Sequence, residues 1–217
     1  MTDRAEKEYI EKLVAHAEES LRMLSNKGKS ERERMVCAAF LRCLGVSFSS
    51  PELIAVENDP PDVKYQQAEF EVLELLDKNR RRGDEFKERY GTLKNAKSLD
   101  DTLLAFRSPT PITFQGLFTQ LIDALLEKSE RYGKEICASL DALILCNLRN
   151  RFLDPNSKYP SIESLKKQGW RSVSFVFPPY SHVIFAKDTS PKVLRSNAGK
   201  TRMKWKNLDS FFAYRKL

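Results

Sequence analysis

Residues 62–75 read DVKYQQAEFEVLEL, and this stretch limits the possible folds of the chain more than any other. Side chains alternate between the two faces of a strand, so Glu69 and Glu71 share one face while Phe70 lies on the other. A shorter strand that begins at Asp62 comes before it, with room for only a tight turn between them. If the two strands pair as a hairpin, Asp62 lies close to Glu71 or Glu69. The pattern therefore predicts a β-hairpin whose acidic side chains gather together.

The three carboxylates of this hairpin are candidate metal ligands. Carboxylates at such short range repel one another, which raises their pKa values and costs stability unless a cation lies between them. Mg²⁺ prefers oxygen ligands and is bound by one or two carboxylates, with water and substrate phosphate completing its shell. Asp62, Glu69 and Glu71 therefore predict a magnesium site suited to phosphodiester cleavage. The alternative is that both glutamates face solvent on an antiparallel strand.

The composition allows a sizeable core within one domain. The chain has 217 residues, of which 41% are hydrophobic and 31% are charged, as in ordinary soluble proteins. No apolar run approaches the roughly 18 residues that a membrane span requires. The N-terminus is too charged to begin a secretory signal peptide. We therefore expect a cytoplasmic protein with no membrane partner.

The cysteines and histidines form no recognisable metal motif. None of the four cysteines belongs to a CxxC pair or lies near a histidine cluster, so reduced and buried thiols are expected. Two histidines are too few for a histidine-rich metal site. His182 could act as a general base, although an isolated histidine in a strand is more often structural. The cysteines are Cys37, Cys43, Cys137 and Cys146, and the histidines are His16 and His182.

The net charge of +7 is concentrated at the C-terminal end of the chain. Residues 187–217 contain nine basic and two acidic residues, whereas the remaining chain has 28 of each. A neutral body with a basic end indicates a polyanionic partner. Aromatic residues between the bases favour packing or base stacking over a solvated tail, which is the alternative. The predicted nucleic-acid contacts of this segment are Lys200, Arg202, Lys204 and Lys206.

Hydrophobic periodicity predicts a single mixed α/β domain over 1–217, built around a sheet. Its parts are N-terminal helices within 1–45, an α/β core over 51–186 and the basic C-terminal segment 187–217. Helices are expected over 3–24, from Ser30 to Gly45, over 78–96, from Thr110 onward and over 160–168. Strands are expected over 53–56, in the hairpin, over 142–146, and as a pair over 172–186 broken at Pro178-Pro179.

The order of these elements and the Pro61-Asp62 dipeptide resemble the PD-(D/E)xK nuclease superfamily, whose core is a restriction-endonuclease-like α-β-β-β-α-β unit. More narrowly, the whole chain resembles a bacterial putative-endonuclease family of unknown function. The resemblance implies a restriction-endonuclease-like fold, with a mixed central β-sheet flanked by helices and an N-terminal helical pair. It also implies an aspartate near the start of the second core strand, matched by Asp62, and an acidic pair on the third, matched by Glu69-Phe70-Glu71.

The lysine of this motif is missing from the chain. If Glu69 is the motif acid, Glu71 occupies the lysine position, and if Glu71 is the acid, Leu73 occupies it. Lys64 is a candidate substitute, because it lies two residues from Asp62 and so shares its strand face. A cross-strand ion pair with Glu69 or Glu71 is the alternative for Lys64.

The resemblance implies one more glutamate, from the helix before the sheet, for which Glu33 and Glu31 are candidates; helix capping is the alternative. Arg80, Arg81 and Arg82 follow the acidic strand and are candidate phosphate contacts, with a solvated turn as the alternative. Together these features predict a metal-dependent endonuclease that uses Mg²⁺ to cleave nucleic acid, with DNA favoured. The alternative is a catalytically degenerate nuclease fold that acts as a non-enzymatic nucleic-acid-binding or protein-interaction module.

Overall fold

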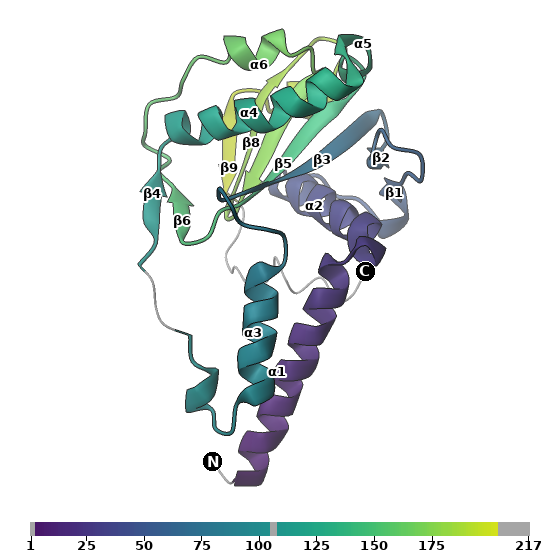
Figure 1. Cartoon of the computed structure of the whole chain (residues 1–217). Helices are drawn as coiled ribbons and strands as arrows, with labels where there is room; N and C mark the ends of the chain where they lie inside the picture. The colour runs from purple at the N-terminus through teal and green to yellow at the C-terminus, as the bar shows by residue number, and fades with distance from the viewer. Residues whose placement is uncertain (1–2, 105–107, 204–217) are drawn as a thin grey trace. The chain divides into compact units, whose positions relative to one another are not determined.

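The structure is a computed structural model, and it describes residues 3–104 and 108–203. The chain forms two compact units, each made of two segments that can be located by residue number along the colour bar of Figure 1. The helical unit comprises Met1–Arg32 and Lys78–Ser108, and the α/β unit comprises Glu33–Asp77 and Pro109–Leu217. The sequence grouped 1–45 as one pair of helices, whereas the structure assigns the first helix and most of the second to different units.

The helical unit is built from two helices and two 3-10 turns. These are α1 Asp3–Leu24, η1 Asn26–Gly28, α3 Asp84–Asn95 and η3 Asp100–Thr102. α1 confirms the helix predicted over 3–24. α3 begins later than predicted, because Gly83 has a φ of +83°, a left-handed conformation that regular helix does not allow. The hydroxyl of Tyr90 donates to Glu18 at 2.7 Å and so joins α3 to α1.

The α/β unit contains a mixed sheet of seven strands in the order β1-β2-β3-β5-β7-β8-β9. β1, β2 and β3 are antiparallel, β3, β5 and β7 are parallel, and β7, β8 and β9 are again antiparallel. The strands are β1 Ile54–Ala55, β2 Val63–Tyr65, β3 Ala68–Leu76, β5 Asp141–Asn147, β7 Ser172–Phe177, β8 Tyr180–Ala186 and β9 Lys200–Met203. β4 Thr110–Ile112 and β6 Arg151–Leu153 form a separate parallel pair.

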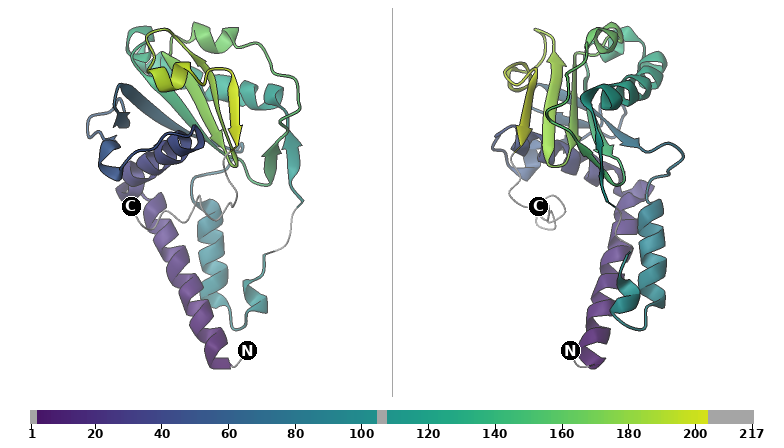
Figure 2. Two further views of the ribbon diagram at one scale, coloured as in Figure 1. Left: turned by 180° about the vertical axis from the view of Figure 1, so that it is seen from behind. Right: turned by 90° about the vertical axis from the view of Figure 1, so that its left-hand side faces the viewer.

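Helices cover both faces of this sheet, as Figures 1 and 2 show. On one face, α4 Phe114–Tyr132 packs a buried stripe against alternate strand residues such as Ile144. On the other face, α2 Lys29–Cys43 packs with Leu143, the neighbour of Ile144 along β5. This alternation follows from the period of two in a strand. The remaining helices are α5 Lys134–Cys137, α6 Glu163–Lys167 and α7 Lys192–Arg195.

The predicted mixed α/β fold with a central mixed sheet flanked by helices is confirmed, as are the hairpin and the strand pair broken at Pro178-Pro179. The prediction that a helix begins at Thr110 is wrong. Pro111 has no N–H and disfavours a helical Thr110, so this segment pairs as β4 instead. The helix begins at Phe114, where the hydroxyl of Thr113 accepts a hydrogen bond from the N–H of Gly116 at 3.1 Å.

Along the described ranges, none of the helices combines the length and apolar character that a membrane crossing requires.

Candidate metal centre

The hairpin of β2 and β3 fixes the position of Asp62. Val63 pairs with Phe70, and the N–H of Asp62 donates to the carbonyl of Phe70 at 3.0 Å. Two residues farther along β3, the N–H of Val72 donates to the Asp62 carboxylate at 2.9 Å. The side chain of Asp62 therefore accepts the hydrogen bond at the end of the ladder, which holds its carboxylate against β3.

Three carboxylates meet beside this point. Asp59, Asp62 and Glu71 each offer one oxygen within 4.8 Å of the other two, and we call this group the carboxylate cluster. Asp59 is exposed, whereas Asp62 and Glu71 are buried, Glu71 with none of its surface accessible. Burial raises the pKa of Glu71, and the negative charge of Asp62 raises it further. The cluster is thus a place where negative charge is costly and a cation would relieve the repulsion.

The end of α4 supplies positive charge to this cluster. Leu121 and Leu125 are core residues, so the same helix face brings Lys128 and Tyr132 onto β3 one and two turns later. The Nζ of Lys128 donates to Glu71 Oε1 and, at 3.2 Å, to the hydroxyl of Tyr132. Burial lowers the pKa of Lys128, but the hydrogen bond and the charge of Glu71 outweigh this effect and raise it. Lys128 is therefore charged at neutral pH and directed at the cluster.

Tyr132 connects the exposed and buried acids. Its hydroxyl lies 3.0 Å from Glu71 Oε1 and 3.1 Å from Asp59 Oδ1, so its single proton can serve one of the two carboxylates at a time. The same hydroxyl accepts a hydrogen bond from Arg131 Nη2 at 2.9 Å. Tyr132 thus ties the loop that carries Asp59 to β3.

The chemistry of the cluster fits a hard divalent cation. The second oxygen of Glu71, Oε2, is buried and receives no hydrogen bond from the part of the chain that the structure describes. A buried carboxylate oxygen without a partner is costly, and a metal ion is one group that would satisfy it. All three side chains offer oxygen, which suits Mg²⁺ or Mn²⁺. Asp59, Asp62 and Glu71 are the residues that could hold such an ion.

Glu69 and Lys64 lie on the same face of the hairpin as Glu71 and Asp62, two residues nearer the turn on each strand. The two residues are directly paired across β2 and β3, and Lys64 Nζ lies 3.0 Å from Glu69 Oε1. The pair is partly exposed, with 46% of the Lys64 side chain and 32% of the Glu69 side chain accessible to solvent. This is the cross-strand ion pair that was the alternative for Lys64, and neither residue belongs to the carboxylate cluster.

The two helix glutamates fall in different units. Glu33 belongs to the α/β unit, where Glu33 and Asp62 both act on the buried thiol of Cys37. Burial raises the pKa of this thiol most, followed by the charges of Asp62 and Glu33. The charges of Glu33 and Asp62 therefore both lie within electrostatic reach of the Cys37 thiol. Glu31 is exposed and belongs to the helical unit.

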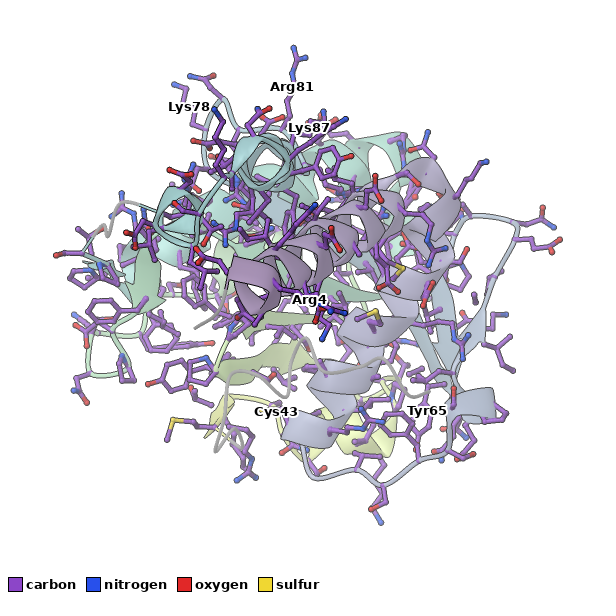
Figure 3. All side chains as sticks on the ribbon, turned by 90° about the horizontal axis from the view of Figure 1, so that it is seen from below. Arg4, Cys43, Tyr65, Lys78, Arg81 and Lys87 are labelled. Atoms are coloured by element: carbon purple, nitrogen blue, oxygen red, sulfur yellow. The ribbon has the colours of Figure 1, made fainter. Side chains whose placement is uncertain are left out.

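The predicted phosphate-binding residues lie in both units. In the helical unit, Arg80 forms an ion pair with Glu85 at 2.8 Å, whereas Arg81 and Arg82 are exposed. Figure 3 shows Arg81 and Lys78 extending outward from this unit. In the α/β unit, Lys200 and Arg202 are exposed on the edge strand β9. Lys204 and Lys206 lie outside the described residues.

Four residues of the site were missed by the sequence analysis: Asp59, Lys128, Arg131 and Tyr132. Asp59 could have been noticed, because it stands three residues before Asp62 in the same turn. Lys128 and Tyr132 continue the spacing of the apolar stripe in α4, but that spacing alone does not show which strand residue they meet. Their role becomes visible only when the helix is packed on the sheet.

The α/β unit thus carries a carboxylate cluster with the ammonium group of Lys128 beside it, and this defines the chain as a mixed α/β protein with a candidate metal centre. Residues 5–207 match the family described as "Putative endonuclease, protein of unknown function (DUF1780)", and the chain belongs to this family. The resemblance to a putative-endonuclease family of unknown function is thereby confirmed.

A solved structure of similar fold comes from Pseudomonas aeruginosa strain PAO1 and is described as a protein of unknown function of the monooxygenase superfamily. It is 30% identical, with a TM-score of 0.66, and the match covers 91% of this chain and 94% of that chain. None of the curated proteins compared matches the chain significantly.

Proposed function

We propose that this protein is a metal-dependent endonuclease of the restriction-endonuclease-like fold, which cleaves phosphodiester bonds in nucleic acid with Mg²⁺. The observation that carries the proposal is the carboxylate cluster, with the unpartnered Oε2 of Glu71 inside it and Lys128 beside it. When α3 and β4, which lie between β3 and α4, and the short α5 are left out, the order α2-β1-β2-β3-α4-β5 is compatible with the α-β-β-β-α-β core of that fold. The description of the family supports the same activity.

In this proposal Asp62 and Glu71 hold the ion, with Asp59 as the ligand on the exposed side. When bound, Mg²⁺ lowers the pKa of a coordinated water and offsets charge in the transition state. Hydrolysis of a phosphodiester adds one water molecule across a P–O bond and leaves a phosphate monoester and a hydroxyl group. Lys128 is the cation next to Glu71, and its ammonium orients the attacking water or stabilises the developing negative charge. Leu73 occupies the lysine position of the motif, so the amine comes from α4 instead.

In this proposal the basic residues outside the cluster bind the phosphate backbone of the nucleic-acid substrate. Arg80, Arg81 and Arg82 would do so from the helical unit, and Lys200, Arg202, Lys204 and Lys206 from the C-terminal segment. Each phosphate contact releases counterions, so the affinity for DNA should fall linearly with salt on a double-logarithmic plot. Glu69 and Lys64, expected from the sequence as a metal ligand and a water-positioning lysine, pair with each other and have only an auxiliary role in this proposal.

Two other functions are separated from this one by experiment. A catalytically degenerate module would bind nucleic acid with the same salt dependence but without cleavage. The Pseudomonas relative's description would instead point to oxygen chemistry. Mononuclear iron sites of oxygenases commonly use two histidines and one carboxylate, whereas this cluster offers three carboxylates, which favours the hydrolytic function.

A cleavage assay tests the proposal. Supercoiled DNA, single-stranded DNA and RNA are incubated with the full chain and Mg²⁺ or Mn²⁺, beside an Asp62→Asn variant. Asparagine still accepts the hydrogen bond of Val72 but removes the charge that the metal requires. Asp123→Asn, at an exposed position of α4, is the matched control. Cleavage by wild type and by the control, but not by Asp62→Asn, supports the proposal; cleavage that survives Asp62→Asn contradicts it.

A further inference from the structure

Arg131 is an exposed arginine whose side chain is held in a defined place. Its guanidinium lies 4.8 Å from the centre of the Tyr132 ring, and its Nη2 donates to the Tyr132 hydroxyl at 2.9 Å. A guanidinium has five N–H donors, and this hydrogen bond uses one of them. Within the described residues, no other hydrogen bond or ion pair of Arg131 is present. Four donors are therefore available to a ligand.

These donors lie at the open side of the carboxylate cluster. The hydroxyl that Arg131 contacts is the one within hydrogen-bond distance of both Asp59 and Glu71. Asp59 is exposed and Glu71 is fully buried, so a ligand approaches from the side of Asp59 and Arg131. The pKa of Arg131 is raised by the Tyr132 hydrogen bond and by the charges of Asp59 and Glu71. The guanidinium therefore interacts electrostatically with the carboxylate cluster.

The negative charge beside Arg131 indicates which kind of phosphate fits there. Asp59 and Glu71 both lie within hydrogen-bond distance of the Tyr132 hydroxyl that Arg131 contacts. A phosphodiester carries one negative charge, whereas a terminal phosphate monoester carries close to two. Because like charges at short range repel one another, these carboxylates disfavour the second charge of a monoester. An internal phosphodiester is therefore the better fit.

We propose that Arg131 binds the non-bridging oxygens of the phosphodiester at the metal centre, and that Tyr132 is the positioning residue that holds the guanidinium there. Arginine matches phosphate through two parallel N–H donors, which a lysine cannot reproduce. The proposal rests on the proposed function for its metal ion, and it adds the recognition of the substrate phosphate and the preference for a diester.

Small phosphate esters test this directly, because they contain nothing that the distant basic residues can bind. Binding of dimethyl phosphate is measured by ³¹P NMR titration of the full chain with Mg²⁺ present, and methyl phosphate serves as the monoester. The variants are Arg131→Ala, Arg131→Lys and Tyr132→Phe. Arg151→Ala, an exposed arginine of β6, is the matched control. A thermal shift with Mg²⁺ alone, run on every variant, reports folding and metal binding.

We expect Arg131→Ala to weaken dimethyl phosphate binding about 10- to 100-fold, as the loss of charged hydrogen bonds predicts. Arg131→Lys restores only part of the affinity, Tyr132→Phe weakens it about 3- to 10-fold, and Arg151→Ala leaves it unchanged. The Mg²⁺ shift is retained in Arg131→Ala. Where bis(4-nitrophenyl) phosphate is hydrolysed, Arg131→Lys should raise KM more than it lowers kcat.

The outcomes separate this inference from the proposed function. Equal binding of dimethyl phosphate by wild type and Arg131→Ala overturns the role of Arg131, even if Mg²⁺ still binds. Tighter binding of methyl phosphate than of dimethyl phosphate by wild type overturns the preference for a diester. A Mg²⁺ shift in wild type without any binding of dimethyl phosphate overturns this inference and leaves the metal centre standing. Absence of both the Mg²⁺ shift and dimethyl phosphate binding in wild type contradicts the inference and the proposed function together.

Discussion

Replacement of Lys128 by methionine removes the positive partner of a buried acid while keeping a side chain of similar length. Glu71 has no accessible surface, and Lys128→Met leaves the Tyr132 hydroxyl as the hydrogen-bond donor to its Oε1 among the described contacts. The carboxylate then loses its counter-charge while Asp62 continues to repel it. We expect the variant to be less stable than wild type in the absence of metal.

The size of the effect follows from burial. Removal of one partner of a buried ion pair costs about 3–5 kcal/mol. Because 23% of the Lys128 side chain is exposed, water screens part of the interaction, and about 2–3 kcal/mol at pH 8 is the expected loss. For a chain of this length, that corresponds to a fall in Tm of about 5–10 °C.

The effect also has a defined dependence on pH. The pKa of Glu71 is raised in the folded state, chiefly by burial, so the folded state holds its proton to a higher pH than the unfolded state does. Stability from this group is therefore full below the unfolded pKa and is lost as pH rises through the folded pKa. Lys128→Met raises the folded pKa further, because Lys128 is the group that lowers it. The destabilisation should be smaller at pH 5 than at pH 8.

Thermal unfolding at the two pH values measures this, with Glu71→Gln and the double variant completing the cycle. In the double variant neither member of the Glu71–Lys128 pair is charged, so most of the stability lost by Lys128→Met at pH 8 should return. Glu127→Gln, an exposed position next to Lys128 in α4, is the control for Glu71→Gln. Equal destabilisation at both pH values, with no recovery in the double variant, would refute the reasoning.

Three further outcomes are expected. Lys64→Ala removes an exposed ion pair with Glu69, so the free energy of unfolding should change by less than about 1 kcal/mol, and DNA cleavage should stay within a few-fold of wild type. Burial lowers the pKa of His182 to about 4, so stability should be full above about pH 6.5 and fall toward pH 4, with a flatter urea-midpoint profile in His182→Gln. Asp141 is buried and accepts from Arg171, so Asp141→Asn should cost about 2–4 kcal/mol by urea unfolding, while the thermal shift caused by Mg²⁺ is unchanged.

The part of the site that could be predicted is the hairpin, whose contacts join residues close together in the sequence. The period of two over β3 and the short turn before it set the hairpin, and the hairpin brings Asp62 to Glu71. The ion pair of Lys64 with Glu69 follows from the same register and was foreseen as an alternative. These contacts depend on residues within about ten positions of one another, so alternation along a strand was enough to find them.

The part that could not be predicted depends on packing between distant segments. Lys128 and Glu71 are 57 positions apart, and the polar residues of α4 do not indicate which strand the helix packs against. The helix stripe fixes which side chains face the sheet, but the crossing position of α4 over β3 depends on the whole core. The search for a motif lysine within the hairpin therefore could not find one that comes from a helix.

The error at Thr110 has a local cause. Proline in the first turn is compatible with a helix start, and the same residue is also compatible with an extended strand. Thr113, three positions later, is the better N-cap, because its hydroxyl accepts from Gly116. Pairing of β4 with β6 then decides the conformation of residues 110–112, and β6 was too short to be predicted.

Metal binding by the carboxylate cluster is the central claim, and thermal unfolding of the full chain across a Mg²⁺ titration tests it most directly. At a concentration about 100 times the dissociation constant, Mg²⁺ should stabilise wild type and the Asp123→Asn control by about 2.7 kcal/mol. Asp62→Asn should show no such stabilisation, although it folds. Absence of any divalent-specific shift in wild type, or an equal shift in Asp62→Asn, would contradict the account.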